Sequence, residues 1–236
     1  MKLEDFVQEL RTAFAADLVG VILYGSAAGA DYHGPASGHN VLVLVRRASV
    51  GGLREAARVV RKWMDGKNPP PLVLTVEEWR GCADVFAMEY ADLLERHRVL
   101  FGELPTAGVS VRGRDLRMQL ESEAMGKLLR FRRGVMSAGS DARRVHALLE
   151  ESLSSVLAIF RATAHLHGEA VPESSEALCD RVGALIGAKT DSVRAVVAHR
   201  RAGEKLEDDA LDGVVAGYLD VLERLASHAD QFSVTD

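Results

Sequence analysis

Residues 21–45 constrain the fold of this chain more than any other segment. The apolar run 21–24 is interrupted by Gly25 and Ser26, and a second apolar run follows at 41–45. Short apolar runs bounded by Gly and Pro are typical of buried strands. A glycine lets the backbone approach a ligand closely, and the free N–H groups at the start of a helix suit a phosphate. The segment therefore predicts a strand, a tight turn into a short helix, a loop and a second strand.

The remaining sequence up to about residue 104 alternates helical and strand patterns. Apolar residues at helical spacing predict helices over 3–16 and 53–64, and apolar runs predict strands over 20–24, 41–45 and 72–76. Residues 77–82 fit a short helical turn, and residues 85–90 fit either a fourth strand or the start of a helix. This alternation predicts a small mixed sheet with flanking helices.

Beyond residue 115 the pattern is helical throughout. One apolar face recurs over 116–135, 145–160, 178–185, 193–197 and 211–225, which indicates an all-helical bundle. Pro105, Gly108 and Gly113 mark the segment between the two patterns. We therefore predict an α+β protein with a sheet domain over 1–104, a linker over 105–114 and a helical bundle over 115–236.

Composition excludes several classes of function. A net charge of −5 over 236 residues gives no electrostatic basis for a nucleic-acid binder. Cys82 and Cys179 lie too far apart in the sequence to suggest a disulfide framework or a zinc site. No apolar run approaches the roughly 18 residues of a membrane span, and the acidic, amphipathic N-terminus does not resemble a signal peptide. We expect a cytoplasmic protein.

A family resemblance rests on two short motifs. Residues 24–29 read YGSAAG, and after a loop Ser37-x-x-Asn40 enters an apolar strand. This arrangement resembles the signature of the nucleotidyltransferase superfamily, which has a DNA polymerase β-like fold. In that signature Asp-x-Asp or Asp-x-Glu opens the second strand, and the two carboxylates bind the Mg²⁺ ions that carry a nucleoside triphosphate. Aligned on Ser37, this chain has Gly38 and Asn40 at the two carboxylate positions.

The order of the two halves strengthens this resemblance. A nucleotidyltransferase-like sheet followed by a helical bundle is similar to kanamycin-type aminoglycoside nucleotidyltransferases and to paired minimal-nucleotidyltransferase and HEPN modules. The segments 84–90 and 95–103 also look like uncharacterised bacterial members of this group. The resemblance implies a nucleotide-binding turn that includes Gly25, Ser26 and Asn40.

The resemblance also indicates candidate catalytic residues. In the family a third acidic residue on a later strand can act as a base, and Glu89 matches it if residues 85–90 form a strand. A rewired metal site built from Asp31, His39 and Glu89 is one interpretation. In the other, Asp31 caps a loop and His39 is a polar residue at a strand entrance.

The helical half contains two further patterns. Basic residues that could hold a triphosphate or an acidic partner, or form a solvated face, are Lys127, Arg130, Arg132, Arg133, Arg143 and Arg144. Arg161 and His167 fit the loose Arg-x5-His pattern of HEPN ribonucleases. Six residues turn a helix by about 240°, so these two side chains share a face only if the helix ends between them.

The missing carboxylates decide between the functional hypotheses. Mg²⁺ requires hard, usually anionic oxygen ligands; Gly38 offers none and Asn40 one neutral carbonyl. We therefore expect a degenerate nucleotidyltransferase-fold protein that acts as a nucleotide-binding or protein-interaction module. The alternatives are a Mg²⁺-dependent enzyme that transfers AMP from ATP to a small-molecule or protein hydroxyl, and a HEPN-type ribonuclease. The expected partners are a nucleotide, a second copy of the chain or another protein, and neither nucleic acid nor membrane.

Overall fold

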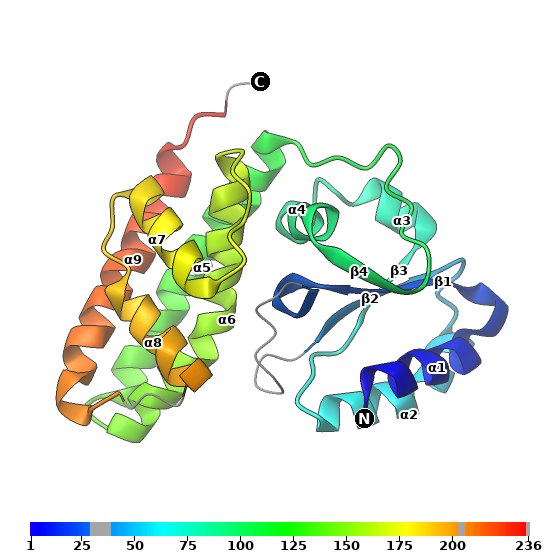
Figure 1. Ribbon diagram of the computed structural model, residues 1–236, viewed down its shortest axis with the longest axis horizontal. Helices are drawn as coiled ribbons and strands as arrows, with labels where there is room; N and C mark the ends of the chain where they lie inside the picture. Colours follow the sequence, from blue (N-terminus) through cyan, green and yellow to red (C-terminus); the bar gives the residue numbers. More distant parts are fainter. Residues whose placement is uncertain (29–38, 203–205, 235–236) are drawn as a thin grey trace. The chain divides into compact units, whose positions relative to one another are not determined.

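The computed structural model describes residues 1–28, 39–202 and 206–234, which form two compact units, Met1–Val111 and Arg112–Asp236. Strands occur in the first unit and long helices in the second (Figure 1). The boundary between the units lies inside the segment 105–114 that the sequence indicates as a linker.

The first unit is a mixed four-stranded sheet with helices on both faces. Its elements are α1 (Leu3–Phe14), η1 (Ala15–Asp17), β1 (Leu18–Tyr24), η2 (Gly25–Ala28), β2 (Asn40–Val45), α2 (Val50–Asp65), β3 (Leu72–Thr75), α3 (Val76–Gly81), α4 (Ala87–Glu95) and β4 (His97–Gly102). The strand order is β3-β2-β1-β4. β1 runs antiparallel to β2 and β4, whereas β2 and β3 are parallel. The predicted α+β class and mixed sheet are confirmed.

The two faces of the sheet bury different cores because successive side chains of a strand point to opposite sides. Val41, Val43 and Val45 of β2 pack with residues of α1 and α2, where Phe6 stacks on Trp63 at 4.1 Å between ring centroids. Leu42 and Leu44 pack on the other face with α3 and α4, where Trp79 and Tyr90 stack at 4.3 Å. With both faces covered, β2 is a continuous apolar run.

Residues 85–90 do not form a strand. α4 begins at Ala87, and its residues Ala87, Tyr90 and Leu93 are buried at helical spacing against the α3 side of the core. The strand interpretation is therefore wrong and the helix interpretation correct. The fourth strand is β4, which comes later and which the sequence patterns did not indicate.

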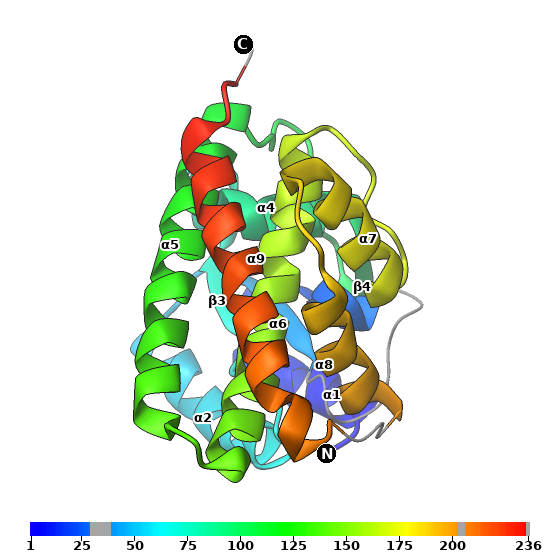
Figure 2. The ribbon, with the colours of Figure 1, turned by 90° about the vertical axis from the view of Figure 1, so that its left-hand side faces the viewer.

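The described part of the second unit is helical, as predicted. It comprises α5 (Gly113–Ala138), α6 (Ala142–Leu166), α7 (Ser175–Ile186), α8 (Asp191–Ala202), the short η4 (Asp208–Ala210) and α9 (Leu211–Gln231). α5 packs along α6 and α9 at one edge of this unit (Figure 2). The long helices enclose Phe131, Phe160 and Tyr218, all nearly inaccessible to solvent. Within the described ranges, none of the helices combines the length and apolar character needed to cross a membrane.

Candidate functional site

The Gly-Ser turn lies at the end of the sheet where β1 stops. Gly25 has a φ of +73°, a conformation that side chains with a Cβ rarely adopt. Residue 26 continues the chain into the short helix η2. Tyr24 pairs with Asn40 on one side and with His97 on the other, so the turn meets the starts of β2 and β4. A Cβ on Gly25 would lie 2.9 Å from Asn40 Nδ2, which places the amide of Asn40 directly against the turn.

His39 lies on the side of the sheet that α2 covers, opposite to the side that α4 covers. Its backbone N–H donates to Asn68 Oδ1 at 3.0 Å, and its Nδ1 lies 3.1 Å from the same oxygen. Asn68 in turn donates from Nδ2 to the carbonyl of Trp63, and the His39 ring lies 5.6 Å from the Trp63 ring. Through Asn68, His39 thus connects the start of β2 to the last turn of α2. This agrees with the interpretation of His39 as a polar residue at the start of a strand. Asp31, the other candidate of the rewired site, lies outside the described residues.

Glu89 lies in the first turn of the helix α4. It is therefore not on a strand, as its match to the third acidic residue of the family required. Burial, reinforced by the negative charges of Glu89 and Asp92, raises the pKa of Tyr24 to about 12. Glu89 and Asp92 are three residues apart on α4 and therefore project from the same side of that helix. The structure brings Gly25 and Asn40 together at one end of the sheet, and the charge of Glu89 acts on the neighbouring Tyr24. Sequence reasoning missed Tyr24 and Asp92; the i, i+3 spacing of the two acids was the available signal.

The four described strands carry no carboxylate. Their sequences are LVGVILY, NVLVLV, LVLT and HRVLFG. In the regions that the structure describes, no group of three or more His, Cys, Asp or Glu side chains is arranged to hold a metal ion. Mg²⁺ favours octahedral sets of anionic oxygens, and the neutral amide of Asn40 does not supply them. The described residues at this turn therefore do not supply the carboxylate pair that binds Mg²⁺ in the nucleotidyltransferase signature.

Lys127 and Arg130 lie in the second unit, on α5. Lys127 is 8% exposed. Burial lowers the pKa of its ammonium, the nearby charge of Arg130 lowers it further, and Glu151 partly opposes both effects. Arg130 is exposed and makes a loose ion pair with Glu123 at 3.7 Å. The two cations are thus neighbours in different surroundings, one buried and one solvated.

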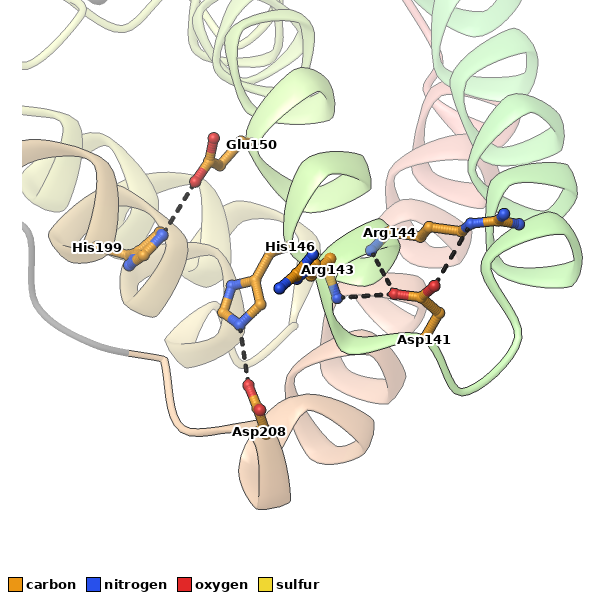
Figure 3. A network of polar contacts seen from close by, with 7 residues as sticks. All are labelled: Asp141, Arg143, Arg144, His146, Glu150, His199 and Asp208. Carbon is orange, nitrogen blue, oxygen red and sulfur yellow. Dashed lines mark hydrogen bonds and ion pairs between the residues drawn. The ribbon is translucent and has the colours of Figure 1, made fainter.

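Other members of the basic cluster have local partners. Arg132 bonds Glu223 of α9 at 2.6 Å. Asp141 caps α6 by accepting from the backbone N–H groups of Arg143 and Arg144 at 3.1 and 3.2 Å, and its carboxylate lies 3.5 Å from the Arg144 guanidinium (Figure 3). The guanidinium groups of Arg132 and Arg144 thus pair with nearby carboxylates of the second unit, as side chains on a solvated helix face commonly do.

In the described part of the second unit, histidines form two pairs, and sequence reasoning singled out His167 but none of the other three members. His146 lies 3.4 Å from Asp208 and His199 lies 3.0 Å from Glu150, with the two rings 5.6 Å apart (Figure 3).

The second pair involves the HEPN candidate His167. α6 ends at Leu166, so the helix does end between Arg161 and His167. His167 Nε2 lies 2.9 Å from His228 Nε2 of α9, and its ring contacts that of Phe232, with 4.8 Å between ring centroids. Both imidazoles are half-buried. His167 is therefore engaged in a contact between two helix ends.

Comparison with known proteins supports the fold. No protein-family model and no curated protein matches the sequence. Among solved structures, the fold is similar to the crystal structure of spectinomycin adenyltransferase AAD(9) from Enterococcus faecialis with ATP and spectinomycin, with a TM-score of 0.59 and 13% sequence identity. The match covers 94% of this chain and 97% of that chain. The chain therefore has a nucleotidyltransferase-like fold, as its Gly-Ser motif implied.

Proposed function

We propose that this nucleotidyltransferase-fold protein is a pseudoenzyme that acts as a nucleotide-binding or protein-interaction module. The observation that carries the proposal is the lack of carboxylates in the described strands, with Asn40 at the start of β2. The sequence places Gly38 two residues earlier, at the other position where the family has a carboxylate.

The chemistry of nucleotidyl transfer supports this proposal. The reaction depends on positioning the triphosphate and neutralising its charge with Mg²⁺. Removing a single transition-state stabiliser costs about 10²–10³ in rate, and losing two metal ligands costs at least that. The turn at Gly25 is retained with its positive φ. ATP is the first nucleotide to test, because the similar AAD(9) structure was obtained with ATP.

One observation favours a second candidate, a Mg²⁺-dependent transfer of AMP from ATP to a hydroxyl. Glu89 and Asp92 both act on Tyr24 at the end of the turn. Among the described residues, these two carboxylates on one side of α4 are acidic groups from which a different metal site could be built. This candidate predicts that Glu89→Gln abolishes Mg²⁺-dependent turnover.

Thermal unfolding of the full chain with ATP, in the presence and absence of Mg²⁺, tests the proposal. A ligand at about 100 times its Kd adds about 2.7 kcal/mol, which raises the Tm of a protein of this size by about 5–10 °C. We expect that any stabilisation by ATP is the same with and without Mg²⁺, and that no AMP is transferred.

The double variant Gly38→Asp/Asn40→Asp is the matched control, because it restores both carboxylates of the family motif. We expect it to gain Mg²⁺-dependent stabilisation by ATP. Mg²⁺-dependent stabilisation or AMP transfer by the unmodified chain would refute the pseudoenzyme proposal in favour of the second candidate.

A further inference from the structure

The outward side of α5 carries a stripe of exposed apolar side chains. Met118, Met125, Leu129 and Met136 are 58%, 45%, 45% and 76% exposed. Their spacings of seven, four and seven residues keep them on one side of the helix, since an α-helix has 3.6 residues per turn. The stripe spans 18 residues, or about 27 Å.

The stripe is separate from the face through which α5 joins the bundle. Leu120, Ala124 and Phe131 are buried on the opposite side of the helix, where α5 packs on α6 and α9 (Figure 2). An amphipathic helix at the edge of a bundle normally presents polar residues to solvent. A long row of exposed apolar residues is instead typical of an interaction surface, and methionine adapts well to such contacts.

The positions of the stripe are symmetric about residue 127. Met118 and Met136 lie nine residues before and after it, and Met125 and Leu129 lie two residues before and after it. If a second α5 packs antiparallel to the first with residue 127 at the twofold axis, Met118 meets Met136 of the second copy and Met125 meets Leu129. The stripe is thus complementary to itself, as a twofold interface requires.

Charges beside the stripe select the same arrangement. Glu121 lies six residues before the centre and Arg132 five residues after it, and their separation of eleven residues places both on the same flank of the stripe. In the antiparallel arrangement, Glu121 of each copy meets Arg132 of the other. In a parallel twofold arrangement the charged flanks of the two helices would lie on opposite sides of the interface, and neither contact would form.

Glu121 and Arg132 are both exposed enough to form a second ion pair, in addition to the one that each makes within its own chain. Glu121 bonds Arg117 at 3.0 Å and is 38% exposed. Arg132 bonds Glu223 and is 46% exposed. Each carboxylate and guanidinium has several hydrogen-bonding positions, so the contacts within one chain and between two chains are compatible.

We propose that the chain forms a twofold-symmetric homodimer in which the exposed stripe of α5 packs antiparallel on the same stripe of a second copy. This inference does not depend on whether the first unit binds a nucleotide. It assigns the protein-interaction surface of the molecule to Met118, Met125, Leu129 and Met136, flanked by Glu121 and Arg132.

Sedimentation velocity of the full chain over a range of concentrations tests the dimer. We expect a dimer for the unmodified chain and a monomer for Met125→Glu, because the substitution places a carboxylate against the apolar side chains of the second copy. Met64→Glu on α2 is the matched control, since Met64 is also a methionine with 45% exposure, and it should remain dimeric. Circular dichroism checks that both variants stay folded. A monomeric unmodified chain, or a dimeric Met125→Glu variant, overturns the proposal.

Two further variants test the antiparallel register. Glu121→Arg and Arg132→Glu should each weaken the dimer by about tenfold in Kd, and the double variant should restore it. Mixing Met125→Cys with Leu129→Cys chains should give a disulfide-linked dimer, because these positions face each other across the axis. Equal cross-linking within Met125→Cys alone would refute the register, since those two sites are offset by about 6 Å along the helices.

Discussion

Three glycines of the first unit provide a graded test of its sheet. Gly25, Gly102 and Gly108 have φ values of +73°, +65° and +78°. A Cβ on Gly108 would meet no described atom within 4 Å. A Cβ on Gly25 would lie 2.9 Å from the side-chain amide of Asn40, and one on Gly102 would lie 1.9 Å from the backbone carbonyl oxygen of Val19.

The expected costs of substitution by alanine follow from these surroundings. A left-handed conformation costs an L-residue about 1–2 kcal/mol, and this is the full cost at Gly108. At Gly25 the cost is similar, because the amide of Asn40 is the end of a side chain that can turn away. At Gly102 the obstacle is the backbone of β1, and only a separation of β1 from β4 would relieve it. Overpacking of this kind adds about 1–3 kcal/mol, which gives about 2–5 kcal/mol for Gly102→Ala.

Urea unfolding followed by tryptophan fluorescence measures these costs in the first unit alone. The chain has two tryptophans; Trp63 and Trp79 are both buried in the first unit. We expect Gly108→Ala and Gly25→Ala to lose similar amounts of unfolding free energy, and Gly102→Ala to lose clearly more. If Gly102→Ala costs no more than Gly108→Ala, the close crossing of β1 and β4 at this glycine is wrong.

Two predictions concern the second unit. Tyr218→Phe removes a buried 2.8 Å hydrogen bond between the tyrosine and Ser152 hydroxyls. We expect the free energy of unfolding, followed by circular dichroism at 222 nm, to fall by about 1–2 kcal/mol. Ser152→Ala and the double variant complete a double-mutant cycle that isolates this hydrogen bond. Burial and then the adjacent His167 lower the pKa of His228, so the unfolded chain takes up a proton at higher pH than the folded chain. Stability should therefore fall as pH drops through about 6.5, and His228→Gln should reduce this dependence in Tm measurements; an unchanged dependence would contradict the assignment.

The helices and the central strands were accessible to sequence reasoning because their burial is periodic or continuous. β2 is buried on both faces and reads as an uninterrupted apolar run. β4 was not predicted, because it lies at the edge of the described sheet beside β1 and its residues alternate irregularly between half-buried and exposed. A register shift between Val21 and Ile22 further disturbs its pairing. An edge strand with such a pattern has no clear period of two.

The site was predicted only in part for a similar reason. The motif indicated Gly25 and Asn40, which the structure places against each other at the end of β1. Glu89 was matched to a strand position, but it reaches Tyr24 because α4 packs across the face of the sheet. Which helix covers the end of a strand depends on tertiary packing, and local patterns do not specify that. The self-complementary stripe of α5 was not predicted from the sequence. Its methionines and Leu129 are compatible with a helix, but the sequence does not show which face of that helix the bundle leaves exposed to solvent.

The charge around the turn bears on which ligand the first unit can accept. Burial and the negative charges of Glu89 and Asp92 raise the pKa of Tyr24 to about 12, so this end of the sheet disfavours the formation of an anion. A triphosphate placed beside Tyr24 would meet the same repulsion. In an active nucleotidyltransferase the bound Mg²⁺ ions offset such repulsion, whereas Asn40 provides no anionic ligand to retain them. A nucleotide bound at this turn without Mg²⁺ would therefore have to keep its phosphates away from Glu89 and Asp92 of α4. An uncharged or cationic partner surface would meet no such repulsion, which is in keeping with the proposed role as an interaction module.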